Sequence, residues 1–168
     1  MNKSLLTPCL IIPLLILSRT ASALQIGDQP PSCQTGSFDE SVTLNFSAKT
    51  NKVLLVDFWA TWCGPCKKSM PFFDQLYREL SEKGLEVVAI NVDEDNQTAR
   101  DYLNKNPVSY PISLDPQGNC PKSFDVKAMP SSYLIDKSGK IRLIHLGFRD
   151  EDQALLRSQI EALLTEKP

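Results

Sequence analysis

Cys63 and Cys66, two cysteines separated by two residues, are the side chains in this sequence best suited to chemistry. A pair at this spacing can close a small disulfide ring and open it again. The Gly64-Pro65 dipeptide between them makes a tight turn, and a helix-like pattern follows. We therefore expect Cys63 at a helix N-terminus, where backbone N–H groups and the helix dipole stabilise a thiolate. The pair predicts dithiol redox chemistry.

Half of a zinc site is the alternative for such a pair. Zinc needs four ligands, and the sequence has no second Cys/His pair to complete the set. We therefore expect no metal and no bound cofactor.

Length and charge limit the class of protein. The chain has 168 residues, enough for one domain with a hydrophobic core. Its 18 basic and 20 acidic residues nearly balance, so nothing indicates a nucleic-acid partner.

Residues 1–23 read as a secretory signal peptide. Lys3 supplies the positive start, an apolar stretch covers 5–17, and small residues precede a cleavage point after Ala23. An uncleaved membrane anchor is the alternative, but the stretch contains two prolines and is shorter than the roughly 20 residues a spanning helix needs. We predict an exported, periplasmic protein with one mature domain over 24–168.

Export affects the interpretation of the other cysteines. The mature chain keeps four cysteines, which allow three connectivities. If Cys63 and Cys66 form the redox pair, Cys33 and Cys120 remain, and thiols tend to pair in an oxidising compartment. A bond between Cys33 and Cys120 is therefore a hypothesis.

The hydrophobic pattern predicts an α/β fold. Helical periodicity covers 63–83, 95–105, a brief segment at 121–124 and the chain from Asp150 onward. Apolar or β-branched runs indicate strands over 52–60, 86–92, 110–114, 132–136 and 141–146, with short edge strands near 42–46. This alternation predicts a central, mixed but mostly parallel sheet with helices on both faces and a final antiparallel hairpin.

The segment around the cysteine pair and two prolines later in the chain resemble those of a known family. The segment Val56–Lys67 is similar to the active-site segment of thioredoxins. Pro71 falls where that family kinks its helix, and Met129-Pro130 resembles its cis-proline. An extra βα unit near 93–114 and the exported N-terminus narrow the resemblance to exported TlpA/ResA-type disulfide reductases. The resemblance implies a thioredoxin-like fold with an N-terminal β extension and an inserted βα unit.

The two cysteines receive different roles. Cys63 is predicted to be the exposed, attacking thiolate, with its pKa lowered toward roughly 7 or below. Cys66, nearly one helical turn later, is predicted to be the buried resolving thiol that attacks the mixed disulfide and releases the reduced substrate.

Asp57 is the one carboxylate in an apolar strand. Burial would raise its pKa. The resemblance implies that it moves the proton on and off the buried cysteine. The alternatives are that it points to solvent or satisfies a backbone group. Where thioredoxins carry a nearby lysine on the next strand, this chain has Ala89.

Several residues are expected to contact the substrate. The resemblance implies that Pro130 is cis and that the Met129 backbone pairs with the substrate strand; an ordinary trans proline at a strand start is the alternative. Trp62, Gly64 and Pro65 are expected to form the docking surface beside the cysteines.

The predicted activity is reduction of disulfides in exported proteins, including apocytochromes c. Gly-Pro between the cysteines is the dipeptide of reducing thioredoxins. Such a reductase implies a membrane electron donor of the DsbD/CcdA kind. The alternatives are a disulfide oxidase and a non-catalytic binding or chaperone-like module with a structural disulfide. A thiol peroxidase is disfavoured, because its Thr-x-x-Cys site is absent from the sequence.

Overall fold

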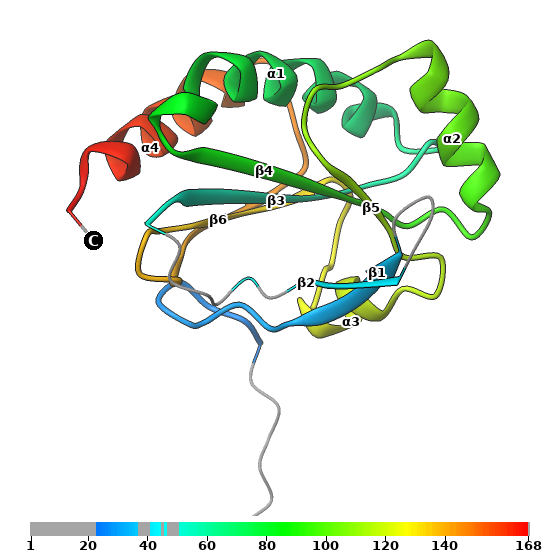
Figure 1. The fold of residues 1–168 in the computed structure, drawn as a ribbon, viewed down its shortest axis with the longest axis horizontal. Helices are drawn as coiled ribbons and strands as arrows, with labels where there is room; N and C mark the ends of the chain where they lie inside the picture. The colour runs from blue at the N-terminus through cyan, green and yellow to red at the C-terminus, as the bar shows by residue number, and fades with distance from the viewer. Residues whose placement is uncertain (1–22, 37–40, 45, 47–50, 168) are drawn as a thin grey trace, which may run out of the picture.

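The computed structural model describes residues 23–167 except 37–40, 45 and 47–50, so the predicted signal peptide lies almost wholly outside the described residues. One sheet of seven strands runs in the order β2-β1-β5-β4-β3-β6-β7. The strands are β1 (Cys33–Gly36), β2 (Ser41–Leu44), β3 (Val53–Trp59), β4 (Leu85–Asn91), β5 (Ile112–Leu114), β6 (Ser131–Ile135) and β7 (Ile141–Leu146). The helices are α1 (Gly64–Leu80), the short 3₁₀ helix η1 (Ser81–Lys83), α2 (Asn96–Lys105), α3 (Asn119–Ser123) and α4 (Asp152–Thr165). Figure 1 shows α1 and α4 on one side of the sheet and α3 on the other.

The sheet is mixed, as the sequence predicts, but its parallel part is limited to the centre. Among the described strands, β3 pairs with β4 and β4 with β5 in parallel. The pairings β1–β2, β1–β5, β3–β6 and β6–β7 are antiparallel. Strand β6 follows the short helix α3 and runs opposite to β3, beside which it lies.

Helix α1 follows directly from the cysteine turn. Pro65 fits in its first turn, where the backbone N–H that proline lacks has no partner within the helix. The predicted helix over 63–83 is confirmed as α1 followed by η1, and it continues through Pro71. It ends at Gly84, whose φ of +103° favours glycine.

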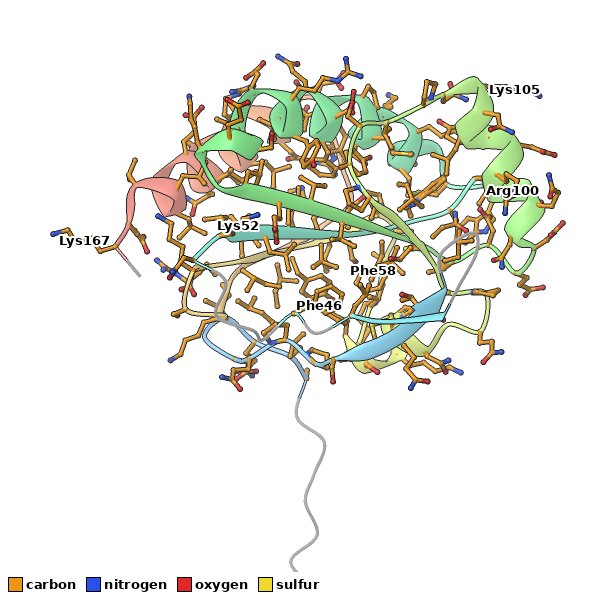
Figure 2. The ribbon with its side chains drawn as sticks, in the orientation of Figure 1. Phe46, Lys52, Phe58, Arg100, Lys105 and Lys167 are labelled. Atoms are coloured by element: carbon orange, nitrogen blue, oxygen red, sulfur yellow. A yellow bond between two sulfur atoms is a disulfide. The ribbon has the colours of Figure 1, made fainter. Side chains whose placement is uncertain are left out.

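The two faces of the sheet bury separate apolar clusters. The face toward α1 and α4 holds Leu55 and Trp59 of β3 together with Cys66 and Phe73 of α1. The opposite face holds Phe58 with Phe46 and with Phe124, which follows α3, and Phe46 and Phe58 are labelled in Figure 2. Because strand residues alternate between faces, Asp57 lies on the α1 face.

The hypothesis that Cys33 and Cys120 pair is confirmed: the structure bonds them, with a Cα–Cα distance of 5.2 Å. The bond belongs to the cluster on the α3 face and ties β1 to α3. The backbone N–H of Cys120 also donates to the buried Asp115 carboxylate, at 2.7 Å. The disulfide therefore attaches β1 to α3, and the Asp115 hydrogen bond fixes Cys120 in turn to the end of β5.

Removing this bond should cost considerable stability. It closes a chain segment of 87 residues, and the loss of that constraint in the unfolded chain predicts a decrease in the free energy of unfolding of about 4 to 5 kcal/mol. We expect the double variant Cys33→Ser/Cys120→Ser, compared with wild type by urea denaturation, to show this decrease. A change below about 1 kcal/mol would contradict a stabilising role.

Candidate active site

The Cys63–Cys66 pair lies at the N-terminus of α1, as predicted. The two sulfurs are bonded, with a Cα–Cα distance of 5.3 Å. Cys63 is the N-cap of α1, and its Sγ accepts a hydrogen bond from the backbone N–H of Cys66 at 3.2 Å. A helix N-terminus favours negative charge, so this position suits a thiolate on Cys63 once the bond is reduced.

The exposure of Cys63 differs from the prediction. Cys63 is the more accessible of the pair, but it is only 4% exposed, against 0% for Cys66. The reason is that its sulfur is directed toward Cys66 and the N–H groups of α1 in the bonded form. The exposed surface beside it comes instead from Trp62, which is 68% exposed, and from Gly64 and Pro65.

The loop with Met129 and Pro130 lies at the same end of the sheet. The peptide bond between them is cis, as predicted. Ser131 pairs with Phe58, next to the segment that leads into the cysteine turn. Pro130 is buried and its carbonyl accepts from the Gly147 N–H at 2.8 Å, whereas Met129 is half-buried.

A second carboxylate, Asp93, holds the cysteine turn and was missed from the sequence. Its oxygens accept from the Thr61 backbone N–H at 3.0 and 3.2 Å and from the Thr61 hydroxyl at 3.0 Å. The Asn91 side chain donates to it at 2.7 Å. These bonds fix the residue two positions before Cys63 to the end of β4. Only the position of Asp93 just after an apolar strand could have indicated this role.

Asp57 is fully buried, which excludes the alternative that it points to solvent. Its Oδ1 accepts from the Ser132 hydroxyl at 2.7 Å, while its Oδ2 has no hydrogen-bond partner among the described residues. Desolvation raises the pKa of Asp57 from 3.8 to about 7, and the Ser132 hydrogen bond opposes the rise. Its neighbour on β4 is Ala89, as expected, so no lysine lies at that position.

Tyr110 is a further ionisable group near Asp57. It is buried in the cluster that contains Cys66, and its hydroxyl has no hydrogen-bond partner among the described residues. Burial and the negative charges of Asp57 and Asp74 raise its pKa above 10. Tyr110 therefore stays protonated at neutral pH, and Asp57 is the group that can exchange a proton there.

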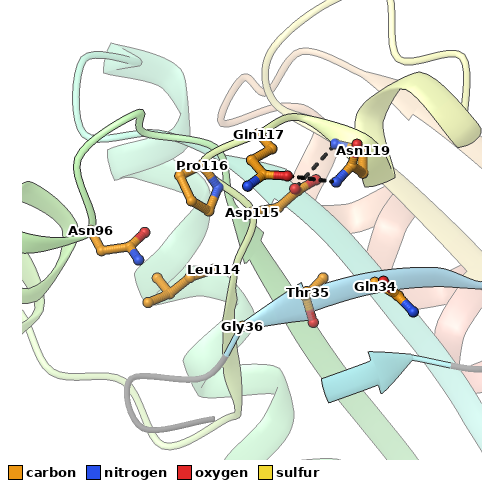
Figure 3. A pocket seen from close by; sticks show the side chains of 9 residues that line it. All are labelled: Gln34, Thr35, Gly36, Asn96, Leu114, Asp115, Pro116, Gln117 and Asn119. Carbon is orange, nitrogen blue, oxygen red and sulfur yellow. Dashed lines mark hydrogen bonds between the residues drawn. The ribbon is translucent and has the colours of Figure 1, made fainter. Parts of the chain in front are cut away.

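The polar pocket shown in Figure 3 lies elsewhere. It has a volume of about 250 Å³ and is formed by the ends of β1 and β5 and the residues around them, including Asp115, Gln117 and Asn119. None of the predicted site residues lines it.

Comparisons with known proteins agree with this site. The family model described as Redoxin matches residues 25–164. The chain is 31% identical over 145 residues to the thiol-disulfide oxidoreductase ResA of Oceanobacillus iheyensis, covering 84% of this chain and 72% of that protein. It is also 31% identical over 118 residues to ResA of Bacillus thuringiensis subsp. konkukian, covering 70% of this chain and 68% of the relative.

A solved structure supports the same assignment. A candidate thiol:disulfide interchange protein DsbE from Chlorobium tepidum superposes with a TM-score of 0.79 and 39% identity, over 84% of this chain and 99% of that one. The TlpA/ResA-type resemblance and the thioredoxin-like fold are therefore confirmed.

The burial of Asp57 predicts a specific pH dependence of stability. The pKa of Asp57 is about 7 in the folded protein, whereas its ordinary value, which applies to the unfolded chain, is 3.8. Between these two pH values the folded protein therefore keeps a proton that the unfolded chain loses. The ionisation of Asp57 therefore leaves stability unchanged below about pH 4 and lowers it progressively up to about pH 7, by about 1.4 kcal/mol for each pKa unit. The variant Asp57→Asn keeps the shape but cannot ionise, so it should become more stable than wild type as pH rises through this range. Urea denaturation of both oxidised proteins tests this, and parallel pH curves would contradict it.

Proposed function

The chain belongs to the Redoxin family and is a thiol–disulfide oxidoreductase, and from this premise we propose that it is an exported reductase of disulfides in other exported proteins, such as apocytochromes c. The observation that carries the proposal is the Cys63–Cys66 pair at the start of α1, with a helix N–H directed at Cys63. The Gly-Pro dipeptide between the cysteines supports the reducing direction.

The reaction is two successive thiol–disulfide exchanges. The Cys63 thiolate attacks one sulfur of the substrate disulfide, so a mixed disulfide forms and the other substrate sulfur leaves and takes up a proton. Cys66 then loses its proton and attacks Cys63. This closes the Cys63–Cys66 bond and releases the second substrate sulfur. The substrate gains two electrons, and the protein dithiol loses them.

The residues around the pair receive roles in these steps. Asp57 accepts the proton of Cys66 and returns it when the pair is reduced again. Its raised pKa of about 7 supports this role, because the carboxyl can both take up and release a proton near neutral pH. Trp62, Gly64 and Pro65 form the docking surface, and the Met129 backbone beside Pro130 pairs with the substrate chain.

Export and electron supply complete the proposal. Residues 1–23 act as a cleaved signal peptide, and 24–168 form the mature thioredoxin-like domain. Within the part of the chain that the structure describes, no helix is both long and apolar enough to span a membrane. Outside the cytoplasm, the pair needs a membrane electron donor of the DsbD/CcdA kind to return it to the dithiol form.

Reduction of insulin with dithiothreitol as the electron source tests the catalytic proposal. Wild-type protein should accelerate the reaction, Cys63→Ser should abolish the acceleration, and Cys66→Ser should stop at a mixed disulfide. The double variant Cys33→Ser/Cys120→Ser is the matched control and should stay active, because its cysteines lie on the other face of the sheet. Full activity of Cys63→Ser, or none in wild type, would reject the proposal and favour a non-catalytic binding module.

The mass of the protein recovered from the exported fraction of producing cells tests the signal peptide. We expect a chain that starts at Leu24. A protein that keeps residues 1–23 and stays with the membrane would favour the anchor instead.

A further inference from the structure

Three polar side chains form a row across three neighbouring strands. Asp57 of β3 pairs directly with Ser132 of β6, and Ser132 pairs directly with His145 of β7. Directly opposite residues of antiparallel strands share a face of the sheet, so all three lie on the face covered by α1 and α4. The adjacent row on this face is apolar and consists of Leu55, Leu134 and Leu143.

The row leads from the interior to the surface. Asp57 is fully buried and Ser132 is 2% exposed, whereas the side chain of His145 is 15% exposed. Beyond His145 lies Asp152, at the start of α4, whose side chain is 23% exposed. The His145 Nε2 is 3.3 Å from the Asp152 Oδ2, although this contact is not aligned as a hydrogen bond.

The proposed reaction requires a route for a proton to and from Asp57. The Asp57 carboxyl has no contact with solvent. A proton that it receives from Cys66 must therefore pass through other groups before it reaches solvent. Toward β4 its neighbour is Ala89, which cannot carry a proton. Toward β6 its neighbour is the Ser132 hydroxyl, already hydrogen-bonded to Oδ1 at 2.7 Å. A hydroxyl can donate one proton while it accepts another.

We propose that Ser132 and His145 carry the proton between Asp57 and the protein surface. The inference rests on the proposed role of Asp57, and both residues act through that carboxyl. The carboxyl passes its proton to Ser132 Oγ while the hydroxyl passes its own proton to the His145 ring, which releases it beside Asp152. The reverse path supplies a proton when Cys66 is regenerated. Protons move and no electrons are exchanged, so the balance of the disulfide steps is unchanged.

The other ionisable groups around the row do not offer a second route for the proton between Asp57 and the surface. Tyr110, from the segment before β5, is the further ionisable group near Asp57, and its raised pKa keeps its proton in place at neutral pH. Cys66, in the α1 cluster, is the source of the proton. Near His145, Asp152 also accepts from the Arg149 backbone N–H at 2.7 Å, which fixes the carboxylate close to the ring. This histidine is the only one in the chain, and its ring has two nitrogens, so it can accept a proton at one and donate from the other.

Rapid mixing of the reduced protein with Ellman's reagent, an aromatic disulfide, separates the two exchange steps. The first coloured thiolate is released when Cys63 attacks, and the second when Cys66 resolves the mixed disulfide. In His145→Gln the first phase should be unchanged, while the second should slow several-fold at neutral pH, because an Asp57 carboxyl that already holds a proton must release it before it can accept the one from Cys66. Added imidazole should restore the second phase, because a small base can replace the missing ring.

Two variants of Ser132 complete the test. Ser132→Ala removes the hydroxyl and should slow the second phase, and it also serves if His145→Gln does not fold. Ser132→Thr keeps a hydroxyl and should retain the wild-type rate. Two phases in wild type, together with an unchanged rate of the second phase in His145→Gln and Ser132→Ala, would overturn the proposed proton path but not the proposed role of Cys66. Release of only one thiolate by wild type would overturn the proposed role of Cys66 and this inference with it.

Discussion

The burial of one ionisable carboxyl in the centre of the sheet is the constraint on which this structure depends. Asp57 has no exposure, one hydrogen bond and a pKa raised to about 7. Its ionised form costs roughly 4 kcal/mol relative to the unfolded chain, which is a large share of a typical domain's stability. An apolar residue would fill this position without that cost. The cost is understandable if the carboxyl serves the chemistry of the cysteine pair on the same face.

The mixed sheet brings the parts of the site together. Because β3 lies between β4 and β6, its C-terminal end is flanked by the Asp93 network on one side and by the Met129–Pro130 loop on the other. The same arrangement keeps the two disulfides apart. Cys63–Cys66 belongs to the cluster facing α1, and Cys33–Cys120 to the cluster facing α3. One domain can therefore contain both an exchangeable disulfide and a disulfide that holds the fold.

The local features of the site could be predicted from the sequence, and the contacts between distant segments could not. Cys63, Pro65 and the helix that follows form a continuous segment, so their pattern was sufficient to place the pair at a helix start. The bond from Ser132 to Asp57 depends on the register between β3 and β6, which no local pattern indicates. The position of His145 opposite Ser132 depends in the same way on the register between β6 and β7. The antiparallel direction of β6 beside β3 likewise follows from the pairing of distant strands, which the sequence pattern alone does not show.

The redox state of Cys33, Cys63, Cys66 and Cys120 in living cells tests the central claim most directly. Acid quenching followed by alkylation and mass spectrometry would report each disulfide separately in the exported fraction. A reductase with a structural second disulfide predicts that Cys63 and Cys66 are mainly alkylated while Cys33 and Cys120 remain bonded. A Cys63–Cys66 pair that is mainly oxidised, in cells with a working electron donor, would contradict the account and favour an oxidase.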